Sequence, residues 1–293
     1  MSNQDLIIPE RSRDIGDFLV GRLLPFRKKR MVGPFIFIDH MGPVDLKAGH
    51  YMDVDQHPHI GLATLTFLLE GEIEHQDSLG TRQVIRPGSV NWMVAGSGVA
   101  HTERTPAYIR DKQESYRMHG YQIWVALPKD LEDSEPSFHH FDAQDLPSFT
   151  LGENKMTLVA GEAFGRQSPV PVHSPLFMVE LKAEADNEID LSGQMKGEIG
   201  ICVVEGAVYA CDQKVEAGNL LVAKEEDVCK LGIEKGSHLL FFGGEAFPEG
   251  RHIYWNFVSS DAEKIEAAKE KWKNWDWPKV EGDDSYVPLP GTK

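Results

Sequence analysis

The sequence predicts an all-β protein built from two β-barrels, with one helix near its C-terminal end. Short apolar or β-branched segments alternate with turns rich in Gly, Pro or charged residues along most of the chain. A pair of turn motifs occurs twice in the same order. The length of 293 residues corresponds to two domains at about 150 residues each. The composition, 41% apolar and 26% charged, is that of a folded protein and excludes collagen-like and largely disordered classes.

Eight segments carry the strand prediction. Each is short, apolar or β-branched, and bounded by turn residues, as in sandwiches and barrels. They are residues 35–38, 63–69, 83–85, 90–94, 121–127, 176–181, 199–204 and 238–242. The proline-rich residues 169–175 are predicted to cross from one domain to the other.

One segment late in the chain predicts a helix. Residues 260–263, Ser-Asp-Ala-Glu, are a capping box that begins at Ser260. Ile265, Ala268 and Trp272 follow on one helical face, with Lys and Glu on the others. We therefore expect a helix that buries this apolar face.

The repeat consists of two glycine turns. Residues 69–73 (LEGEI) resemble residues 204–208 (VEGAV), 135 positions later. Residues 86–90 (RPGSV) resemble residues 216–220 (EAGNL), 130 positions later. The common order predicts two related β-barrels, although turns of this kind also arise by coincidence.

Charge and cysteine usage limit the partners and the compartment. The chain carries 46 acidic and 30 basic residues, a net charge of −16, which argues against direct nucleic-acid and anionic-membrane binding. Residues 1–9 do not resemble a signal peptide, and no apolar run reaches the about 18 residues of a membrane helix. The three cysteines, Cys202, Cys211 and Cys229, form no C-x-x-C pair, which favours reduced thiols. We expect a soluble, cytoplasmic protein.

Two short motifs carry metal-ligand side chains at alternate positions. In a strand, residues i and i+2 point to one face, about 6.5–7 Å apart, so His57 and His59 can reach one metal ion. His101 and Glu103 repeat this spacing. A single H-x-H pair is more often a surface or core feature, but two such pairs favour a site of three histidines and one carboxylate. Such a donor set suits Fe(II), Mn(II), Ni(II) or Cu(II).

The same residues resemble the pirin family of the cupin superfamily. Residues 57–71 (HPHIGLATLTFLLEG) resemble the first cupin motif of pirins, and residues 87–103 (PGSVNWMVAGSGVAHTE) resemble the second. The similarity continues through residues 122–128 and 242–245. It implies a bicupin, in which two double-stranded β-helix (jelly-roll) barrels face each other. It also implies a metal-binding domain over residues 1–145 and a metal-free domain, with the terminal helix and tail, over residues 146–293.

The resemblance also assigns the ligands. Pirins bind their metal through residues that match His57, His59, His101 and Glu103. It implies one Fe(II) per chain, with Ni, Mn, Cu or Zn as possible substitutes. Shifting these four positions by the repeat offsets leads to Ser192, Gln194, Leu231 and Ile233, so the second barrel is expected to lack ligands.

The sequence departs from the cupin pattern at Ala63, where a glutamate usually follows the H-x-H pair. Strand parity with His57 and His59 predicts that Ala63 looks into the site, which makes the pocket roomier and less acidic. If the strand continues without a bulge, the same parity predicts Leu65 and Phe67 as apolar walls. Trp92 and Met93 are further candidates by nearness, without a prediction of which one faces inward.

Two functions fit these features. The first is a dioxygenase that cleaves the central ring of a flavonol such as quercetin and releases carbon monoxide, with Glu103 as ligand and proton acceptor. The second, also implied by the resemblance, is a non-enzymatic regulator that binds a protein partner according to the redox state of iron. The apolar residues near the site favour the dioxygenase.

Overall fold

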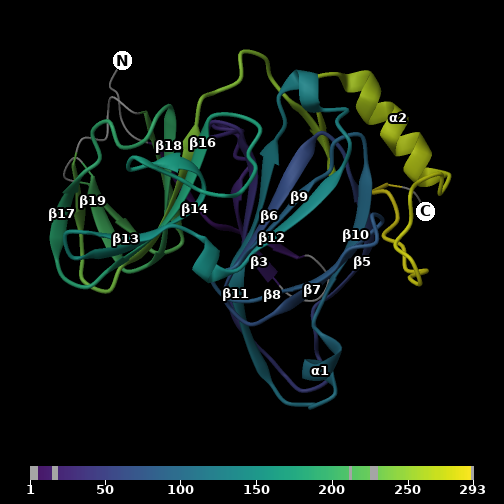
Figure 1. Cartoon of the computed structure of the whole chain (residues 1–293), viewed down its shortest axis with the longest axis horizontal. Coiled ribbons are helices and arrows are strands. Elements are labelled where there is room, and N and C mark those ends of the chain that lie inside the picture. The colour runs from purple at the N-terminus through teal and green to yellow at the C-terminus, as the bar shows by residue number, and fades with distance from the viewer. Residues whose placement is uncertain (1–5, 15–18, 211–212, 225–229, 292–293) are drawn as a thin grey trace. The chain divides into compact units, whose positions relative to one another are not determined.

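The computed structural model describes residues 6–14, 19–210, 213–224 and 230–291, and it is built mainly of antiparallel strands (Figure 1). Seven of the eight predicted strand segments lie wholly in strands, and the segment 121–127 extends one residue beyond β11 (Tyr116–Ala126), which confirms the all-β fold class with a C-terminal helix. Cys202 is buried, whereas Cys211 and Cys229 lie outside the described residues. No helix in the described ranges is both long and apolar enough to cross a membrane.

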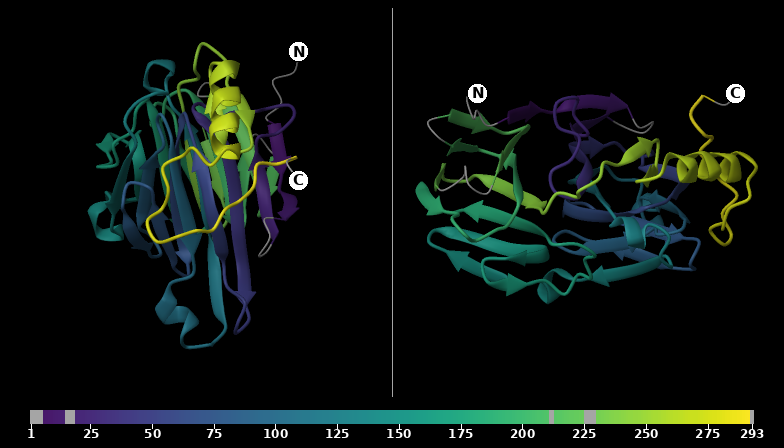
Figure 2. Two further views of the ribbon diagram at one scale, coloured as in Figure 1. Left: turned by 90° about the vertical axis from the view of Figure 1, so that its right-hand side faces the viewer. Right: turned by 90° about the horizontal axis from the view of Figure 1, so that it is seen from above.

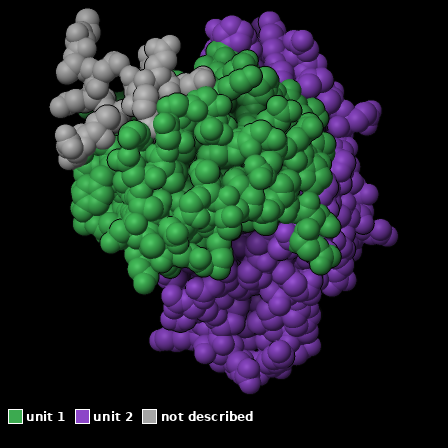
Figure 3. All heavy atoms as spheres, turned by 60° about the vertical axis from the view of Figure 1, so that its left-hand side comes forward, with its two compact units in different colours: residues 1–12, 21–38, 144–247 green, residues 13–20, 39–143, 248–293 purple. Residues whose placement is uncertain are grey.

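The chain divides into two compact units (Figure 3). Unit 1 comprises residues 1–12, 21–38 and 144–247, and unit 2 comprises residues 13–20, 39–143 and 248–293. The sequence-based domain limits differ from this division at both ends of the chain. The N-terminal strand β1 (Leu6–Pro9) belongs to unit 1 because it pairs with β21 (Asn219–Lys224). Residues 169–175 lie inside unit 1, so the prediction that they cross between domains was wrong.

Most strands of unit 2 lie in two sheets, the larger of which also contains residues 11–12, 21–24 and 35–38 from the ranges of unit 1. The smaller sheet has the order β5-β10-β7-β8, formed by Asp53–His59, Val99–Arg104, Ile73–Asp77 and Arg82–Ile85. The larger has the order β12-β9-β6-β11-β4-β3-β2, formed by Ser137–Phe141, Val90–Val94, Leu62–Glu70, Tyr116–Ala126, Phe35–Leu46, Leu19–Leu24 and Arg11–Asp14. The short elements around them are α1 (Ala107–Arg110), η1 (Lys129–Leu131) and η2 (Ala143–Asp145).

Unit 1 also has two sheets. The larger follows β1-β21-β18-β23-β16-β14-β13, where β18 is Glu198–Glu205, β23 His238–Gly244, β16 Leu176–Ala183, β14 Asn154–Ala163 and β13 Ser148–Leu151, with β15 (Arg166–Gln167) beside β14. The smaller follows β17-β22-β19-β20, formed by Asn187–Asp190, Lys230–Ile233, Ala207–Ala210 and Gln213–Glu216.

The two units repeat one strand order, which confirms the predicted repeat. The order β5-β10-β7-β8 corresponds to β17-β22-β19-β20, and β9-β6-β11-β4 corresponds to β21-β18-β23-β16. Gly71 and Gly206 occupy equivalent turns with φ of 83° and 75°. These left-handed conformations favour glycine, because a Cβ atom would be strained there. The turn glycines, rather than the side chains of the cores, therefore carry the repeat in the sequence.

The smaller sheet of unit 1 faces an apolar core. Leu231 and Ile233 of β22 belong to a buried cluster with Ile189 of β17. Ser192 and Gln194, the other two positions reached by the repeat offsets, are exposed after β17. Apolar side chains thus fill this barrel where ligands would otherwise lie.

Helix α2 (Ala262–Lys273) buries the predicted face, Ile265, Ala268 and Trp272. Its N-cap is Asp261, one residue after the predicted Ser260, and the Asp261 carboxylate accepts a hydrogen bond from the Glu263 amide at 2.9 Å.

The buried face of α2 lies in an aromatic cluster with Ile60, Ala100 and Phe257 of unit 2. Strand β25 (Phe257–Ser259), which pairs with β24 (His252–Tyr254), connects to Ile60 through a parallel bridge with Phe257. The views in Figure 2 show the helix and the chain after it beside the strands of this unit. The prediction placed the helix and tail in the domain of residues 146–293. They belong instead to unit 2, because the apolar residues that they pack against are in that unit.

Candidate metal centre

Three of the predicted ligands meet inside unit 2. His57 and His59 lie on β5, and His101 on β10 is the direct antiparallel partner of His57. The rings of His57 and His101 have centroids 4.3 Å apart, and the Nε2 atoms of His59 and His101 are separated by 3.1 Å. Each histidine has a possible ligand atom within 4.8 Å of the others. Within the described part of the chain this is the one such group of three or more His, Cys, Asp or Glu residues.

The environment of the histidines keeps them neutral. Burial lowers the pKa of His57 to about 4, and burial lowers the pKa of both His59 and His101 well below the ordinary value. The Nδ1 atom of His57 lies 2.8 Å from the backbone oxygen of Asp55, so it donates a proton there and leaves Nε2 with a lone pair. Neutral imidazoles are the form that a metal ion requires.

Glu103 lies on β10 two residues after His101 and is not one of the three members of the histidine group. A register shift between His101 and Glu103 interrupts the pairing of β10 with β5. The partly buried Glu103 carboxylate accepts a hydrogen bond from Gln122 Nε2 at 3.2 Å, and Gln122 Oε1 accepts one from Thr66 at 2.8 Å. Burial raises the pKa of Glu103 to about 7, although the hydrogen bonds from Thr66 and Gln122 oppose the rise. The carboxyl group can therefore hold or release a proton near neutral pH.

The side chains of β6 that face the three histidines are not the predicted ones. Gln122 on β11 contacts Glu103, and the ring of Trp124 stands edge-on to His59 at 5.2 Å. Gln122 and Trp124 pair with Thr66 and Thr64, so these threonines share their face of the sheet. Alternation then places Ala63, Leu65 and Phe67 on the opposite face. The prediction that these three residues line the site was wrong.

The error comes from the turn between β5 and β6. Gly61 has a φ of 65°, and the two strands it separates belong to different sheets. Strand parity therefore does not carry from His59 to Ala63, because it holds only along a continuous extended chain. Ala63, Leu65 and Phe67 are fully buried on the other side of the sheet.

The register of β9 decides between Trp92 and Met93. Met93 pairs with Thr64 and therefore faces the three histidines, whereas Trp92 pairs with Leu65 and faces away. Phe138 on β12 pairs with Met93 and lies on the same face. Its ring stacks on His75 with centroids 4.6 Å apart.

Sequence reasoning missed a second pair of ligand-type residues, His75 and Asp77 on β7. His75 Nδ1 lies 3.1 Å from His101 Nδ1, and His75 Nε2 lies 3.0 Å from Asp77 Oδ2. Both residues are buried. The signal was present, because His75-Gln76-Asp77 has the same alternate spacing as the two motifs that were recognised.

The tail of the chain covers the outer edge of β5. The buried Gln56 side chain accepts a hydrogen bond from the Val280 amide at 2.9 Å and donates to the carbonyls of Asp283 and Ser285 at 3.2 and 3.3 Å. The Val287 amide donates to the Gln56 carbonyl at 3.0 Å. β5 is the edge strand of its sheet, so these bonds fix the segment that carries two of the three histidines.

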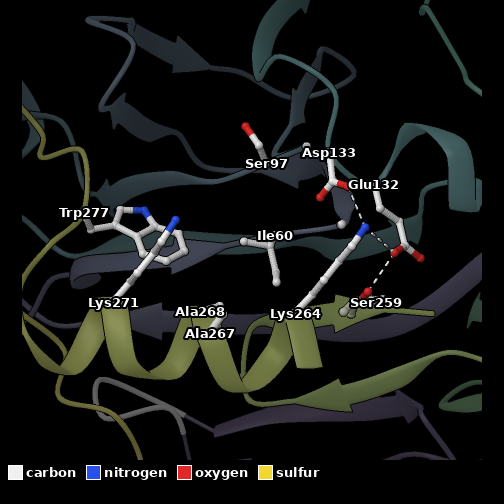
Figure 4. Close-up of a pocket in the computed structure, with 13 residues that line it drawn as sticks. Ile60, Ser97, Glu132, Asp133, Ser259, Lys264, Ala267, Ala268, Lys271 and Trp277 are labelled. Carbon is white, nitrogen blue, oxygen red and sulfur yellow. Dashed lines mark hydrogen bonds and ion pairs between the residues drawn. The ribbon is translucent and has the colours of Figure 1, made fainter. Parts of the chain in front are cut away.

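Two cavities in unit 2 lie apart from the histidines. One, of about 150 Å³, is bordered by α2, with Lys264 and Lys271 extending from the helix and Glu132 and Asp133 beside Lys264 (Figure 4). The other, of about 330 Å³, is lined by residues around α1, including Tyr108. None of the predicted site residues lines either cavity.

The fold and the site together define a bicupin with a histidine triad in one barrel. The chain belongs to the pirin family: the family Pirin matches residues 18–125, and the pirin C-terminal cupin domain matches residues 178–277. A pirin-like protein of Caulobacter vibrioides is 44% identical, over 98% of this chain and 99% of that protein. A Pseudomonas aeruginosa protein, named provisionally as a quercetin 2,3-dioxygenase, is 35% identical over 92% of this chain and 84% of that protein.

Solved structures agree with this assignment. The crystal structure of a quercetin 2,3-dioxygenase from Acinetobacter baumannii has a TM-score of 0.90 and 34% identity, and the match covers 99% of this chain and 96% of that chain. A bacterial pirin of Escherichia coli, solved in complex with nickel(II), has a TM-score of 0.66 and 20% identity, over 83% of this chain and 100% of that chain. The second match supports the fold alone.

Proposed function

We propose that this chain is a metal-dependent dioxygenase that cleaves a flavonol such as quercetin with release of carbon monoxide. The observation that carries the proposal is the buried, neutral triad of His57, His59 and His101, with the titratable Glu103 carboxyl group two residues after His101 on the same strand. The similarity to the Acinetobacter baumannii quercetin 2,3-dioxygenase supports the reaction class.

The donor set fits a divalent metal. His57, His59 and His101 would hold one ion per chain, and Glu103 would be the fourth ligand. We propose Fe(II), with Ni, Mn, Cu or Zn as substitutes, because nitrogen and oxygen donors accept all of these ions. Such an ion supplies Lewis-acid activation of a bound substrate oxygen and access to dioxygen chemistry.

The protein's own contribution to the reaction is proton transfer at Glu103. A flavonol must lose the proton of its 3-hydroxyl group to become reactive, and a carboxylate with a pKa of about 7 can accept it near neutral pH. Gln122 and Thr66 orient the carboxylate, since Gln122 donates to Glu103 while its own oxygen is held by Thr66. In this role Glu103 is the catalytic base and Gln122 is a positioning residue.

The face of the sheet that looks toward the triad offers a surface for a flat aromatic body. Trp124, Met93 and Phe138 lie on it, as the contacts of Trp124 with His59 and of Phe138 with His75 show. We propose these residues, in place of Ala63, Leu65, Phe67 and Trp92, as the apolar walls around the substrate.

Oxygen uptake with quercetin tests the function. The metal-loaded protein should consume oxygen, release carbon monoxide and bleach the flavonol absorbance in air, and all three signals should vanish without oxygen. His59→Ala should abolish them, whereas His252→Ala, which removes an exposed histidine, should leave them unchanged. Metal-loaded protein that takes up no oxygen with flavonols would overturn the proposal. A protein partner recovered in only one iron oxidation state would then favour the regulator.

A further inference from the structure

Three buried side chains, those of Asp77, His75 and His101, form a hydrogen-bonded series that connects β7 to the triad. Asp77 and His75 lie on β7, and β7 pairs with β10 so that Asp77 is the register partner of His101. His75 Nε2 is 3.0 Å from Asp77 Oδ2, and His75 Nδ1 is 3.1 Å from His101 Nδ1. The exposed fractions of the three residues are 4%, 1% and 0% for His75, Asp77 and His101.

The side chains of Asp77 and His75 are held in place by further contacts. The other carboxylate oxygen of Asp77, Oδ1, accepts hydrogen bonds from the amides of Leu79 and Thr81 at 2.9 and 3.0 Å. Phe138 stacks on the His75 ring with an interplanar angle of 23°. Asp77 therefore presents Oδ2 to His75, and the His75 ring has little freedom to turn.

The direction of the hydrogen bonds follows from the carboxylate. Asp77 can only accept, so His75 donates from Nε2, and a neutral His75 then has an acceptor at Nδ1. His101 must donate to it from Nδ1, which leaves the lone pair of His101 on Nε2, the atom that faces His59. The opposite tautomer would turn an N–H group toward the triad and block ligation.

We propose that His75 and Asp77 are a positioning pair that holds His101 in its metal-binding tautomer and orientation, although neither residue belongs to the triad. The inference rests on the metal-binding part of the proposed function and does not depend on the flavonol or on oxygen. Outer partners of this kind typically change metal affinity by about 10- to 100-fold.

Asp77→Asn tests the direction of the bonds. The two backbone amides keep an oxygen at the position of Oδ1, so the new amide nitrogen faces His75 and donates to it. This substitution reverses the direction of both hydrogen bonds, from residue 77 to His75 and from His75 to His101, and places the proton of His101 on Nε2. Asp142→Asn is the matched control, because Asp142 contacts His140 Nε2 at 3.2 Å in a pair that does not reach the triad.

Two readouts follow this change. Titration with Ni(II) should show a dissociation constant about 10- to 100-fold higher for Asp77→Asn, and within twofold of wild type for Asp142→Asn. Nitrogen-15 NMR of the metal-free protein should show the His101 proton on Nδ1 in wild type and on Nε2 in Asp77→Asn. Unchanged affinity and an unchanged tautomer in folded Asp77→Asn would overturn the proposal.

A second variant covers the case in which Asp77→Asn does not fold. In His75→Phe/Asp77→Asn the new phenyl ring can stack on Phe138 and the Asn oxygen still accepts from Leu79 and Thr81. His101 is then free in either tautomer, so Ni(II) affinity should be lower than in wild type. Wild-type affinity in this variant would refute the positioning role. If the wild-type protein itself bound no Ni(II), the proposed function would fail instead, so the two failures are distinct.

Discussion

Gln122 donates a hydrogen bond to Glu103 across 3.2 Å, and this contact joins the larger sheet of unit 2 to the strand that carries His101. Glu103 follows His101 by two residues on β10, its carboxyl group is bonded to the Gln122 amide, and burial raises its pKa to about 7. Whether Glu103 becomes a metal ligand or stays on Gln122 can be decided from proton release.

Metal binding at pH 6 should release close to one proton per ion if Glu103 becomes a ligand. At this pH the Glu103 carboxyl is mostly protonated, since its pKa is about 7, whereas His57 is already neutral with a pKa of about 4. At pH 8 the release should fall toward zero. Calorimetry in buffers of different ionisation enthalpy measures this quantity. Glu103→Gln should release none at either pH, and equal release from Glu103→Gln and wild type at pH 6 would show that the carboxylate is not a ligand.

Gln122→Leu should move the pH dependence of turnover upward. The hydrogen bond from Gln122 lowers the pKa of Glu103, which is about 7 in the wild-type protein. Removal of this hydrogen bond should therefore raise the pKa of Glu103. The base acts in its ionised form, so activity should increase with pH. The pH of half-maximal activity should be about half to one pH unit higher than in wild type, because a hydrogen bond of about 1 kcal/mol corresponds to a pKa shift of that size. A pH–rate profile measures the shift. Gln76→Leu, at a glutamine that contacts Glu74 instead, should leave the profile in place, and an unmoved midpoint in Gln122→Leu would exclude the contact as a determinant.

The purified protein should contain close to one metal ion per chain. The barrel of unit 1 has Leu231 and Ile233 in a buried apolar cluster at the positions equivalent to His101 and Glu103. His57→Ala/His101→Ala should reduce the content to near zero. Elemental analysis of both proteins after dialysis checks this expectation, and two ions that survive the double substitution would contradict it.

Gln56→Ala should lower the free energy of unfolding by about 1–3 kcal/mol, because buried backbone groups of the tail lose their partners. The side chain is fully buried and makes three hydrogen bonds to Val280, Asp283 and Ser285. Chemical denaturation of the metal-free protein measures the loss. Gln83→Ala, at a half-buried glutamine bonded to the neighbouring Val84 carbonyl, is the control and should stay within about 0.5 kcal/mol of wild type. A loss no larger than that of the control would mean that the tail does not stabilise β5.

The features that depend on local spacing could be predicted from the sequence. The alternate positions of His57 and His59 and of His101 and Glu103 identified the two strands that carry the histidine triad, because neighbouring positions in a strand point to opposite faces. The spacing of Ile265, Ala268 and Trp272 identified the buried face of α2 for the same kind of reason. The glycines at 71 and 206 marked equivalent turns, since both need a positive φ.

Which side chains surround the triad depends on how distant strands pair, and local spacing does not predict it. The turn at Gly61 moves the chain into another sheet, so the parity of His59 says nothing about Ala63 or Leu65. Only the register of neighbouring strands brings Trp124, Gln122 and His75 to the site, and register depends on pairings between residues far apart in the chain. The packing of α2 in unit 2 likewise depends on contacts between residues far apart in the chain. An apolar helical face specifies that it will be buried, but its partner is whichever complementary surface the folded chain places beside it.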